Sequence, residues 1–386
     1  MTKPLKPLLR FNSYNEDWEQ RKLGDVVPIT MGQSPDGSTY SDTPSDYILV
    51  QGNADLQNGW VTPRIWTSQV TKKADGGDLI MSVRAPAGAM GKTAYNVVIG
   101  RGVAAIKGNE FIYQLLVKMN SNGYWKVLSC GSTFESLNSD NIKNADVLIP
   151  DVAEQEKIGE YFVNLDRLIT LHQRKLDTLK VVKKSMLEKM FPREGCKVPE
   201  VRFSGFTEDW EQRKLVDIAT FINGRAYSQD ELLNEGKYKV LRVGNFYTND
   251  SWYYSDLELN DKYYVDKGDL LYTWSATFGP HIWLGERVIY HYHIWKIQPK
   301  NDLDKHFAVH LLNNDKDKIT SDKNGSTMVH ITKIGMENKD VTLPNIDEQK
   351  KLAQMFDNLN NLITLHQREL ELLQNVKKSL LEKMFV

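Results

Sequence analysis

Cysteine is scarce in this sequence, and long apolar runs are absent. Its 386 residues include two cysteines, Cys130 and Cys196, and neither belongs to a Cys-x-x-Cys pair. A disulfide framework and a zinc-ribbon site therefore have no support. No apolar run approaches the roughly 18 residues of a membrane span, and Met1 to Lys6 lacks the apolar core of a signal peptide. We expect a cytoplasmic protein that carries free thiols and does not enter a membrane.

An excess of one charge sign is also lacking. The 49 lysines and arginines nearly balance 50 acidic residues, which gives a formal net charge of -1. A basic domain is the usual electrostatic footprint of nucleic-acid binding, so any such surface must be local or supplied by a partner. With 41% hydrophobic residues, the chain can bury two modest cores.

Catalytic and metal motifs fail on inspection. Gly91-Lys92-Thr93 looks like the end of a phosphate-binding loop, but Pro86 stands where that motif requires glycine. Neither a Gly-x-Gly-x-x-Gly motif after a strand nor the Asn/Asp-Pro-Pro-Tyr string of an amino-methyltransferase occurs. His281, His291 and His293 have no cysteine or paired carboxylate beside them, which favours packing or contact roles over metal binding. We therefore expect a binding protein without catalytic or metal-ligating residues.

What the sequence does contain is an internal duplication. The string Asp17 to Leu23 returns unchanged at Asp209 to Leu215, and Leu168 to Arg174 returns at Leu362 to Arg368. A repeat of half the chain length is too long for a solenoid, so each half should be one domain plus a connector. Between the matched blocks the halves diverge. One scaffold therefore carries two different surfaces.

Each half ends in an apolar heptad pattern after a proline, Pro150 or Pro344. The pattern predicts two helices of about 33 residues that pair antiparallel within the chain, related by an approximate twofold axis. Ile158 should then lie near Met384, and His172 near Leu370. The predicted seam consists of Ile158, Phe162, Leu165, Ile169, Leu176 and Leu179 in the first copy and Leu352, Phe356, Leu359, Ile363, Leu370 and Leu373 in the second.

Polar residues interrupt both seams. We interpret His172 and His366 as residues that set the register, in preference to a metal or proton role. Lys183 and Lys377 are expected to extend outward to solvent.

The rest of each half predicts a β-rich domain. An aromatic lead-in, ending at Trp18 in the first half and Trp210 in the second, is expected to pack in the core. Strand-like runs follow at 47–50, 78–83, 96–99 and 102–106, and at 238–243, 269–274 and 288–295. The fold class is therefore α+β, with two tandem β-rich domains separated by two long antiparallel coiled-coil helices. The expected segments are 1–150, 151–192, 193–345 and 346–386.

Together these motifs resemble the DNA specificity subunit of type I restriction-modification systems. The resemblance rests on the order and duplication of the Asp17 to Leu23 string, the 77–92 glycine-rich turn, Gly131-Ser132-Thr133, the helix start at 150–155 and the Leu-Glu-Lys-Met-Phe helix end. The second half departs from it, because Trp274 to Pro280 replaces the glycine-rich turn.

The resemblance implies that each domain is a target-recognition domain that reads one half of a bipartite, asymmetric site in double-stranded DNA. The helices would set the unread gap and dock two methyltransferase (modification) subunits, which use S-adenosylmethionine. Restriction (translocase-nuclease) subunits, which use ATP and Mg, would join for cleavage. This chain would hold no cofactor and catalyse nothing itself.

Candidate DNA-contacting residues lie in loops or beside turns, where arginine and glutamine can make bidentate contacts with base edges. For the serines and threonines, phosphate contact and turn capping both stay open. The candidates are Gln33, Ser34, Arg64, Arg84, Lys92, Ser132 and Thr133 in the first half and Arg225, Tyr227, Arg242, Asn245, Tyr247, Trp274, Ser326, Thr327 and Lys333 in the second.

Two alternatives belong to other classes. A duplicated coiled-coil scaffold with two protein- or ligand-binding domains would show the same heptads but no salt-dependent DNA binding. A complete single-chain modification enzyme would need an S-adenosylmethionine site, for which recognition and spacing leave no room.

Overall fold

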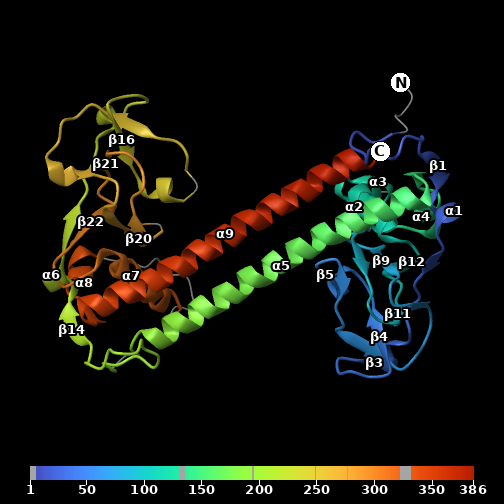
Figure 1. The fold of residues 1–386 in the computed structure, drawn as a ribbon, viewed down its shortest axis with the longest axis horizontal. Coiled ribbons are helices and arrows are strands. Elements are labelled where there is room, and N and C mark those ends of the chain that lie inside the picture. The colour runs from blue at the N-terminus through green and yellow to red at the C-terminus, as the bar shows by residue number, and fades with distance from the viewer. Residues whose placement is uncertain (1–5, 130–134, 194, 248, 276, 322–331) are drawn as a thin grey trace. The chain divides into compact units, whose positions relative to one another are not determined.

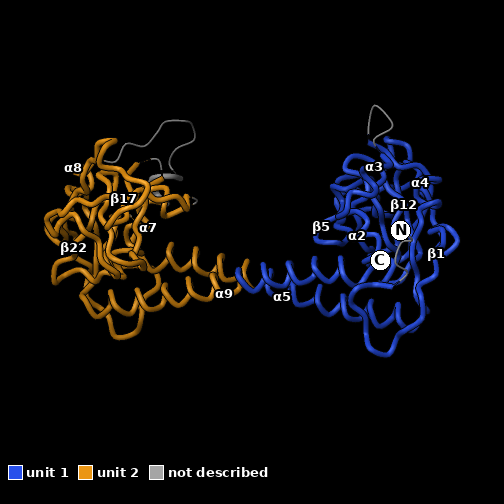
Figure 2. Tube along the Cα trace, turned by 90° about the horizontal axis from the view of Figure 1, so that it is seen from above, with its two compact units in different colours: residues 1–174, 367–386 blue, residues 175–366 orange. Residues whose placement is uncertain are grey.

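The computed structural model describes residues 6–129, 135–193, 195–247, 249–275, 277–321 and 332–386, with the backbone alone for 317–321. Cys130 lies outside these ranges, and Cys196 is an exposed free thiol. The chain divides into unit 1, residues 1–174 and 367–386, and unit 2, residues 175–366 (Figure 2). The units cut both long helices, and the predicted segment boundaries stay a prediction.

The two long helices, α5 (Val152–Met190) and α9 (Ile346–Met384), begin where the prolines predict (Figure 1). Each has 39 residues, more than predicted. A side-chain cap opens both. The Glu154 amide donates to Asp151 Oδ1 over 2.9 Å, and the Glu348 amide donates to Asn345 Oδ1 over 3.0 Å. Within the described residues, no helix combines the length and apolar character needed to cross a bilayer.

Within unit 1, the helices pack antiparallel, as predicted. Ile158 shares one core with Met384, and His172 Nδ1 lies 3.1 Å from Glu369 Oε2, beside Leu370. The seam is dry where the two helices meet the domain, since Ile158 and Phe162 are at most 1% exposed.

Lys377 is a correction. Its side chain was expected to reach solvent, but its Nζ lies 2.6 Å from Asp166 Oδ1 and the side chain is only 19% exposed. Antiparallel packing places this carboxylate opposite the lysine, and an ion pair replaces the water contact. For Lys183, the outward orientation stays a prediction.

Unit 1 contains three sheets and four short helices among the described residues. β1 (Glu19–Lys22) pairs antiparallel with β13 (Asp146–Ile149). The second sheet has the order β2 (Ile29–Met31), β12 (Val103–Ile106), β9 (Leu79–Ser82), β10 (Met90–Lys92), β6 (Trp60–Val61), β5 (Leu56–Gln57). The third has the order β3 (Tyr40–Ser41), β7 (Ile65–Thr67), β4 (Tyr47–Val50), β11 (Val97–Ile99), β8 (Lys73–Ala74). The helices are α1 (Leu23–Val26), α2 (Glu110–Ser121), α3 (Tyr124–Ser129) and α4 (Ser139–Lys143).

The six-stranded second sheet of unit 1, which contains β9, separates two hydrophobic cores. Leu79 and Met81 of β9 face the core shared with α2 and the long helices, while Ile80 faces the core against the third sheet. This alternation is the period of two expected for a strand buried on both faces. The layers are therefore helix, sheet and sheet.

The end of α9 completes the helical core of unit 1. Leu381, Met384 and Phe385 are 7%, 3% and 2% exposed, and the Phe385 ring stacks on Phe111 with 5.1 Å between centroids. Residues more than 200 positions apart in the sequence thus form one core.

Among the described residues, unit 2 has the same arrangement of three sheets, but its two larger sheets have four strands each, against six and five in unit 1. β14 (Glu211–Lys214) pairs antiparallel with β23 (Asp340–Leu343). One sheet has the order β15 (Ala219–Asn223), β22 (Ile294–Pro299), β19 (Leu270–Thr273), β20 (Gly279–Ile282), and the other has β17 (Tyr253–Ser255), β16 (Tyr238–Leu241), β21 (Val288–Tyr290), β18 (Tyr264–Val265). The helices are α6 (Leu215–Ile218), α7 (Lys305–Ser321) and α8 (Lys333–Glu337). Phe191, at the end of α5, packs here, with its ring 5.8 Å from Phe307.

The run 288–295 is not the single strand that the sequence predicts. β21 and β22 belong to different sheets, and His291 to His293 form the turn between them. The Tyr292 amide donates to the Arg225 carbonyl and the Ile294 amide to the His291 carbonyl, each over 3.0 Å. His291 and His293 therefore do not share a strand face.

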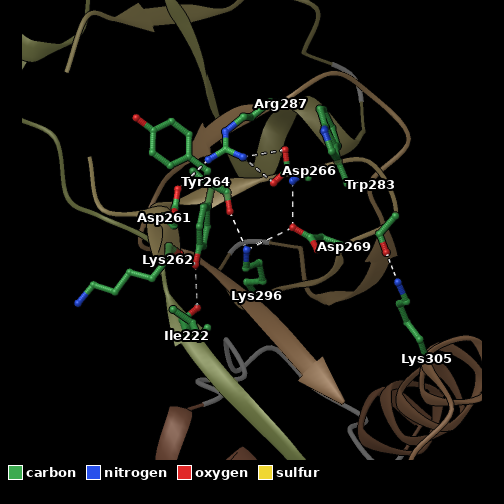
Figure 3. Close-up of polar contacts among 12 residues, drawn as sticks. Ile222, Asp261, Lys262, Tyr264, Asp266, Asp269, Trp283, Arg287, Lys296 and Lys305 are labelled. Carbon is green, nitrogen blue, oxygen red and sulfur yellow. Dashed lines mark hydrogen bonds and ion pairs between the residues drawn. The ribbon is translucent and has the colours of Figure 1, made fainter. Parts of the chain in front are cut away.

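A buried lysine ties the two larger sheets of unit 2 together (Figure 3). Lys296, on β22, is 8% exposed and donates to the Tyr264 carbonyl on β18 over 2.8 Å. Its Nζ also lies 3.3 Å from Asp269 Oδ2. Such a charge is tolerated only because both contacts compensate its burial.

Each lead-in segment is fixed to the start of a long helix. Arg10 makes a bidentate pair with Glu154, with distances of 2.6 and 2.7 Å, and Arg202 pairs likewise with Glu348 at 2.7 Å. Trp18 and Trp210 are each 1% exposed, which confirms that the lead-ins pack.

Candidate nucleic-acid interface

Three loops converge at one end of the two larger sheets in unit 1. The Gln33 amide donates to the Ile99 carbonyl over 2.9 Å, and the Arg101 amide to Ser34 Oγ over 3.2 Å. The Val83 amide donates to the Gly102 carbonyl over 2.9 Å. These bonds bring three predicted contact residues beside one that the sequence analysis missed. We call the group tip 1: Gln33, Ser34, Arg84 and Arg101.

Equivalent bonds build the corresponding end of unit 2. The Arg225 amide donates to the Tyr290 carbonyl over 3.0 Å, and the Trp274 amide to the His293 carbonyl over 3.2 Å. The His291 amide donates to the Leu241 carbonyl over 3.0 Å. We call this group tip 2: Arg225, Tyr227, Arg242, Trp274, His291, Tyr292 and His293.

A glycine at the same place allows the loops of each tip to approach. A Cβ on Gly32 would collide with the carbonyl oxygen of Gly100, and one on Gly224 would collide with that of His291. No side chain fits between backbones this close. The two tips therefore share one backbone frame and differ in their side chains.

Tip 1 holds two arginines whose charge is not neutralised. Arg84 and Arg101 are exposed, and no carboxylate pairs with either one in the part of the chain that the structure describes. Both line a cavity of about 500 Å³, together with Asn138 and Asn141. Arg101, which the sequence analysis missed, has one local signal: it stands between Gly100 and Gly102 in a strand-joining turn.

Arg64 and Lys92, also predicted contacts, are held by carboxylates. Arg64 Nη2 lies 2.8 Å from Asp55 Oδ1, whose side chain is 4% exposed. Lys92 Nζ lies 2.9 Å from Glu110 Oε2 and 4.5 Å from the ring centroid of Tyr113. Burial raises the pKa of the Tyr113 phenol, so this ring stays neutral. The DNA contacts predicted for Arg64 and Lys92 stay a prediction. The positive charge of each side chain is already compensated by a carboxylate.

In tip 2 both guanidinium groups are engaged. Arg225 makes a bidentate pair with Glu231, with distances of 2.6 and 2.9 Å, and these hydrogen bonds lower the pKa of Glu231 to about 2. Arg242 stacks 4.1 Å above the ring of Tyr253. Arg225 is therefore neutralised by a carboxylate, whereas Arg242 keeps its charge and has no carboxylate partner among the described residues.

Aromatic and imidazole groups cover tip 2 instead. Trp274 donates from Nε1 to the Tyr292 carbonyl over 2.9 Å, and its ring lies 5.0 Å from that of His293. The ring of Tyr227 lies 6.4 Å from that of His291. Burial lowers the pKa of His291 to about 4, so this imidazole is neutral at pH 7.

Tyr247 belongs to a neighbouring cluster. Its hydroxyl lies 3.2 Å from Nε2 of His281, whose pKa burial lowers to about 4. Asn245 has a structural role, because its Oδ1 accepts from the Arg242 amide over 3.0 Å. Lys333 lies on α8, 3.4 Å from Glu337. The candidates Ser132, Thr133, Ser326 and Thr327 lie outside the described residues.

Two copies of one family model match the chain. The model, Methylase_S, described as the type I restriction modification DNA specificity domain, covers residues 15–181 and again 207–375. The chain belongs to this family. The two matches contain the two units' tips, so both tips lie within specificity domains.

Relatives of the specificity family agree with this assignment. The chain is 24% identical over 416 aligned positions to the type I restriction enzyme MjaIX specificity subunit of Methanocaldococcus jannaschii, covering 96% of this chain and 93% of that one. A putative MjaX specificity subunit from the same organism is 29% identical over 182 residues, 45% of this chain and 42% of the relative. The chain thus spans under half the length of that second relative.

Solved structures support the fold. The crystal structure of a type I restriction-modification S subunit from M. genitalium has a TM-score of 0.68 at 14% identity and covers 99% of both chains. A chain from work on complex assembly and conformational transition of the type I R-M system has a TM-score of 0.53 at 16% identity, covering 95% of this chain and 97% of that chain.

Proposed function

We propose that this chain is the non-catalytic subunit that gives a type I restriction-modification complex its DNA sequence specificity. Each unit reads one half of a bipartite, asymmetric target in double-stranded DNA, and α5 and α9 set the unread gap. The observation that carries the proposal is that two units share one backbone frame but differ in the side chains of their tips. Two domains with the same backbone arrangement and different tip side chains are suited to bind two different half-sites.

The chemistry of the tips supports different base contacts. Unpaired guanidinium groups, as in tip 1, favour acceptor groups such as phosphates or guanine edges, whereas the rings of tip 2 favour stacking, methyl contacts and neutral hydrogen bonds. A near-zero net charge fits a subunit whose partners supply further phosphate contacts in the cytoplasm.

Apolar pairs on the long helices support partner docking. Leu168 and Leu171 on α5 are 46% and 50% exposed, and Leu362 and Leu365 on α9 are 43% and 51% exposed. Positions three apart lie on one helix face, and these residues lie off the buried seam. We propose that two methyltransferase subunits, which use S-adenosylmethionine, dock on these faces, and that restriction subunits, which use ATP and Mg, join that complex.

The test is to co-express the chain with its methyltransferase partner in a methylation-free host and to map N6-methyladenine across the genome. A split motif with a fixed gap is expected. Replacing residues 11–150 with those of another family member should change only one half of that motif. A soluble complex without new methylation, or a swap that alters both halves, would contradict the proposal.

A further inference from the structure

The polar lining of the tip 1 cavity consists mainly of hydrogen-bond donors. Arg84 and Arg101 contribute guanidinium groups, and Asn138 and Asn141 contribute side-chain amides. Each asparagine uses its side-chain oxygen to accept the other's backbone amide, over 2.8 and 3.0 Å. Their NH2 groups remain as donors. No aspartate or glutamate lines the cavity among the described residues.

This donor set fits an anionic group that only accepts hydrogen bonds. Guanidinium groups bind phosphate oxygens in charge-assisted, often bidentate pairs. The shape of the site separates phosphate from bases. Bases lie at the floor of a major groove about 8.5 Å deep, which only a protruding element reaches. A cavity instead receives what protrudes from DNA, which is the sugar-phosphate backbone.

Unit 2 lacks this arrangement. Val83 and Trp274 make equivalent amide bonds, to Gly102 and His293, so the residue after Trp274, Ser275, stands where unit 1 has Arg84. By the same bonds, Tyr292 stands in the place of Arg101. Tip 2 contains two guanidinium groups: that of Arg225 is paired with Glu231, and that of Arg242 stacks on the ring of Tyr253 and keeps its charge.

We infer that Arg84 and Arg101 clamp one backbone phosphate of the target DNA, and that unit 1 is the ionic anchor of an electrostatically uneven pair of readers. The inference rests on the proposed function and adds a division of labour to it. Tip 1 contributes more of the salt-sensitive affinity through this cavity, while tip 2 binds its half-site with less counterion release.

The inference predicts a change in salt dependence. Each neutralised phosphate contributes about -0.9 to the slope of log K against log salt concentration on duplex DNA. The double variant Arg84→Ala/Arg101→Ala should therefore flatten the slope by about 0.9 and weaken binding at low salt by roughly ten- to hundredfold. The methylated motif should stay the same, because a phosphate contact carries no base information.

The experiment titrates the complex of the full chain and its methyltransferase partner with a fluorescent duplex that carries the mapped motif, over a series of NaCl concentrations. Lys107→Ala is the matched control. It removes one positive charge from unit 1 at the opposite end of β12, where Lys107 pairs with Asp75 over 2.6 Å. Its slope should equal that of the wild type. Arg84→Lys/Arg101→Lys keeps both charges and should keep most of the slope.

Two outcomes would overturn the inference while leaving the proposed function intact. One is an unchanged slope in the double alanine variant. The other is a motif that becomes degenerate at one position in the half-site of unit 1, which would make the arginines base readers. A wild-type complex without sequence-specific binding would instead refute the proposed function itself.

Discussion

At the scale of single residues, the ion pairs of the buried carboxylates at the start of the long helices are expected to contribute strongly to stability. The Glu154 side chain is fully buried and accepts from Arg10 and from Trp18 Nε1, the latter over 3.2 Å. Removing the arginine would leave a buried charge with only one neutral donor. Arg10→Ala should therefore lower the free energy of unfolding by about 3–5 kcal/mol.

Denaturant unfolding of the variant measures this loss. Lys22→Ala is the control, since it breaks an ion pair with Asp146 whose side chains are 45% and 51% exposed, and should cost at most about 1 kcal/mol. Equal effects of the two variants would show that burial does not decide the strength of these pairs.

His281 predicts a pH dependence for unit 2. Burial lowers its pKa from the model-peptide value of 6.5 to about 4, so between these values the unfolded chain binds more protons than the folded one. The contribution of neutral His281 to the free energy of unfolding is therefore fully present above pH 6.5 and is lost as the pH falls toward 4.

The measurement follows the unfolding midpoint from neutral to acidic pH for the wild type and for His281→Gln. The variant should lose part of the acid sensitivity, because glutamine does not titrate. An identical pH profile for the two proteins would assign the sensitivity to other groups.

At this scale, the sequence did not predict which arginines lack a carboxylate partner. Arg64, Arg84 and Arg225 all stand in polar, loop-like sequence. Arg64 pairs with Asp55 and Arg225 with Glu231, while Arg84 has no such partner among the described residues. Ion pairing depends on how loops fold back on one another, and local residue spacing does not record it.

At the scale of elements, periodic patterns predicted the structure well. The heptads specify both long helices because a buried stripe repeats over many turns. The 288–295 run misled because β-forming residues continue through the turn at His291 to His293. That turn depends on a bond to Arg225, more than 60 positions earlier in the sequence.

The exposed leucines of α5 give a prediction for a whole helix face. Leu168→Asp/Leu171→Asp should abolish co-purification of the methyltransferase partner, because charge on an apolar docking face must be desolvated. The fold should persist, since both side chains are about half exposed. Pull-down with a tagged partner measures the effect.

Leu284→Asp is the control for this surface, because Leu284 is 74% exposed on a loop of unit 2. It should leave partner binding unchanged. Normal co-purification of the α5 double variant would place the docking face elsewhere.

At the scale of the whole molecule, each unit contains the C-terminal end of the long helix that begins in the other unit. The end of α9 belongs to unit 1, and the end of α5 belongs to unit 2. Phe385 follows α9 and is 2% exposed in the core of unit 1, and Phe191 follows α5 and is 4% exposed in the core of unit 2. Phe385→Ala should therefore destabilise unit 1 and Phe191→Ala unit 2, each by about 3–5 kcal/mol.

Hydrogen exchange read separately over 79–106 and 270–297 distinguishes the two effects. Each variant serves as the control for the other, since the substitution is the same and only the position differs. Faster exchange in both segments for both variants would mean that the units unfold together and that the division into two cores has no energetic meaning.

The same exchange of helix ends sets an order for synthesis on the ribosome. Unit 2 has all its residues once the chain has reached His366, whereas unit 1, which begins at the N-terminus, waits for residues 367–386. The domain that is translated first is thus the last to close. A nascent chain that has not reached residues 367–386, or a chain truncated before them, exposes the aromatic core around Trp18 and Phe111, because those residues are needed to bury it.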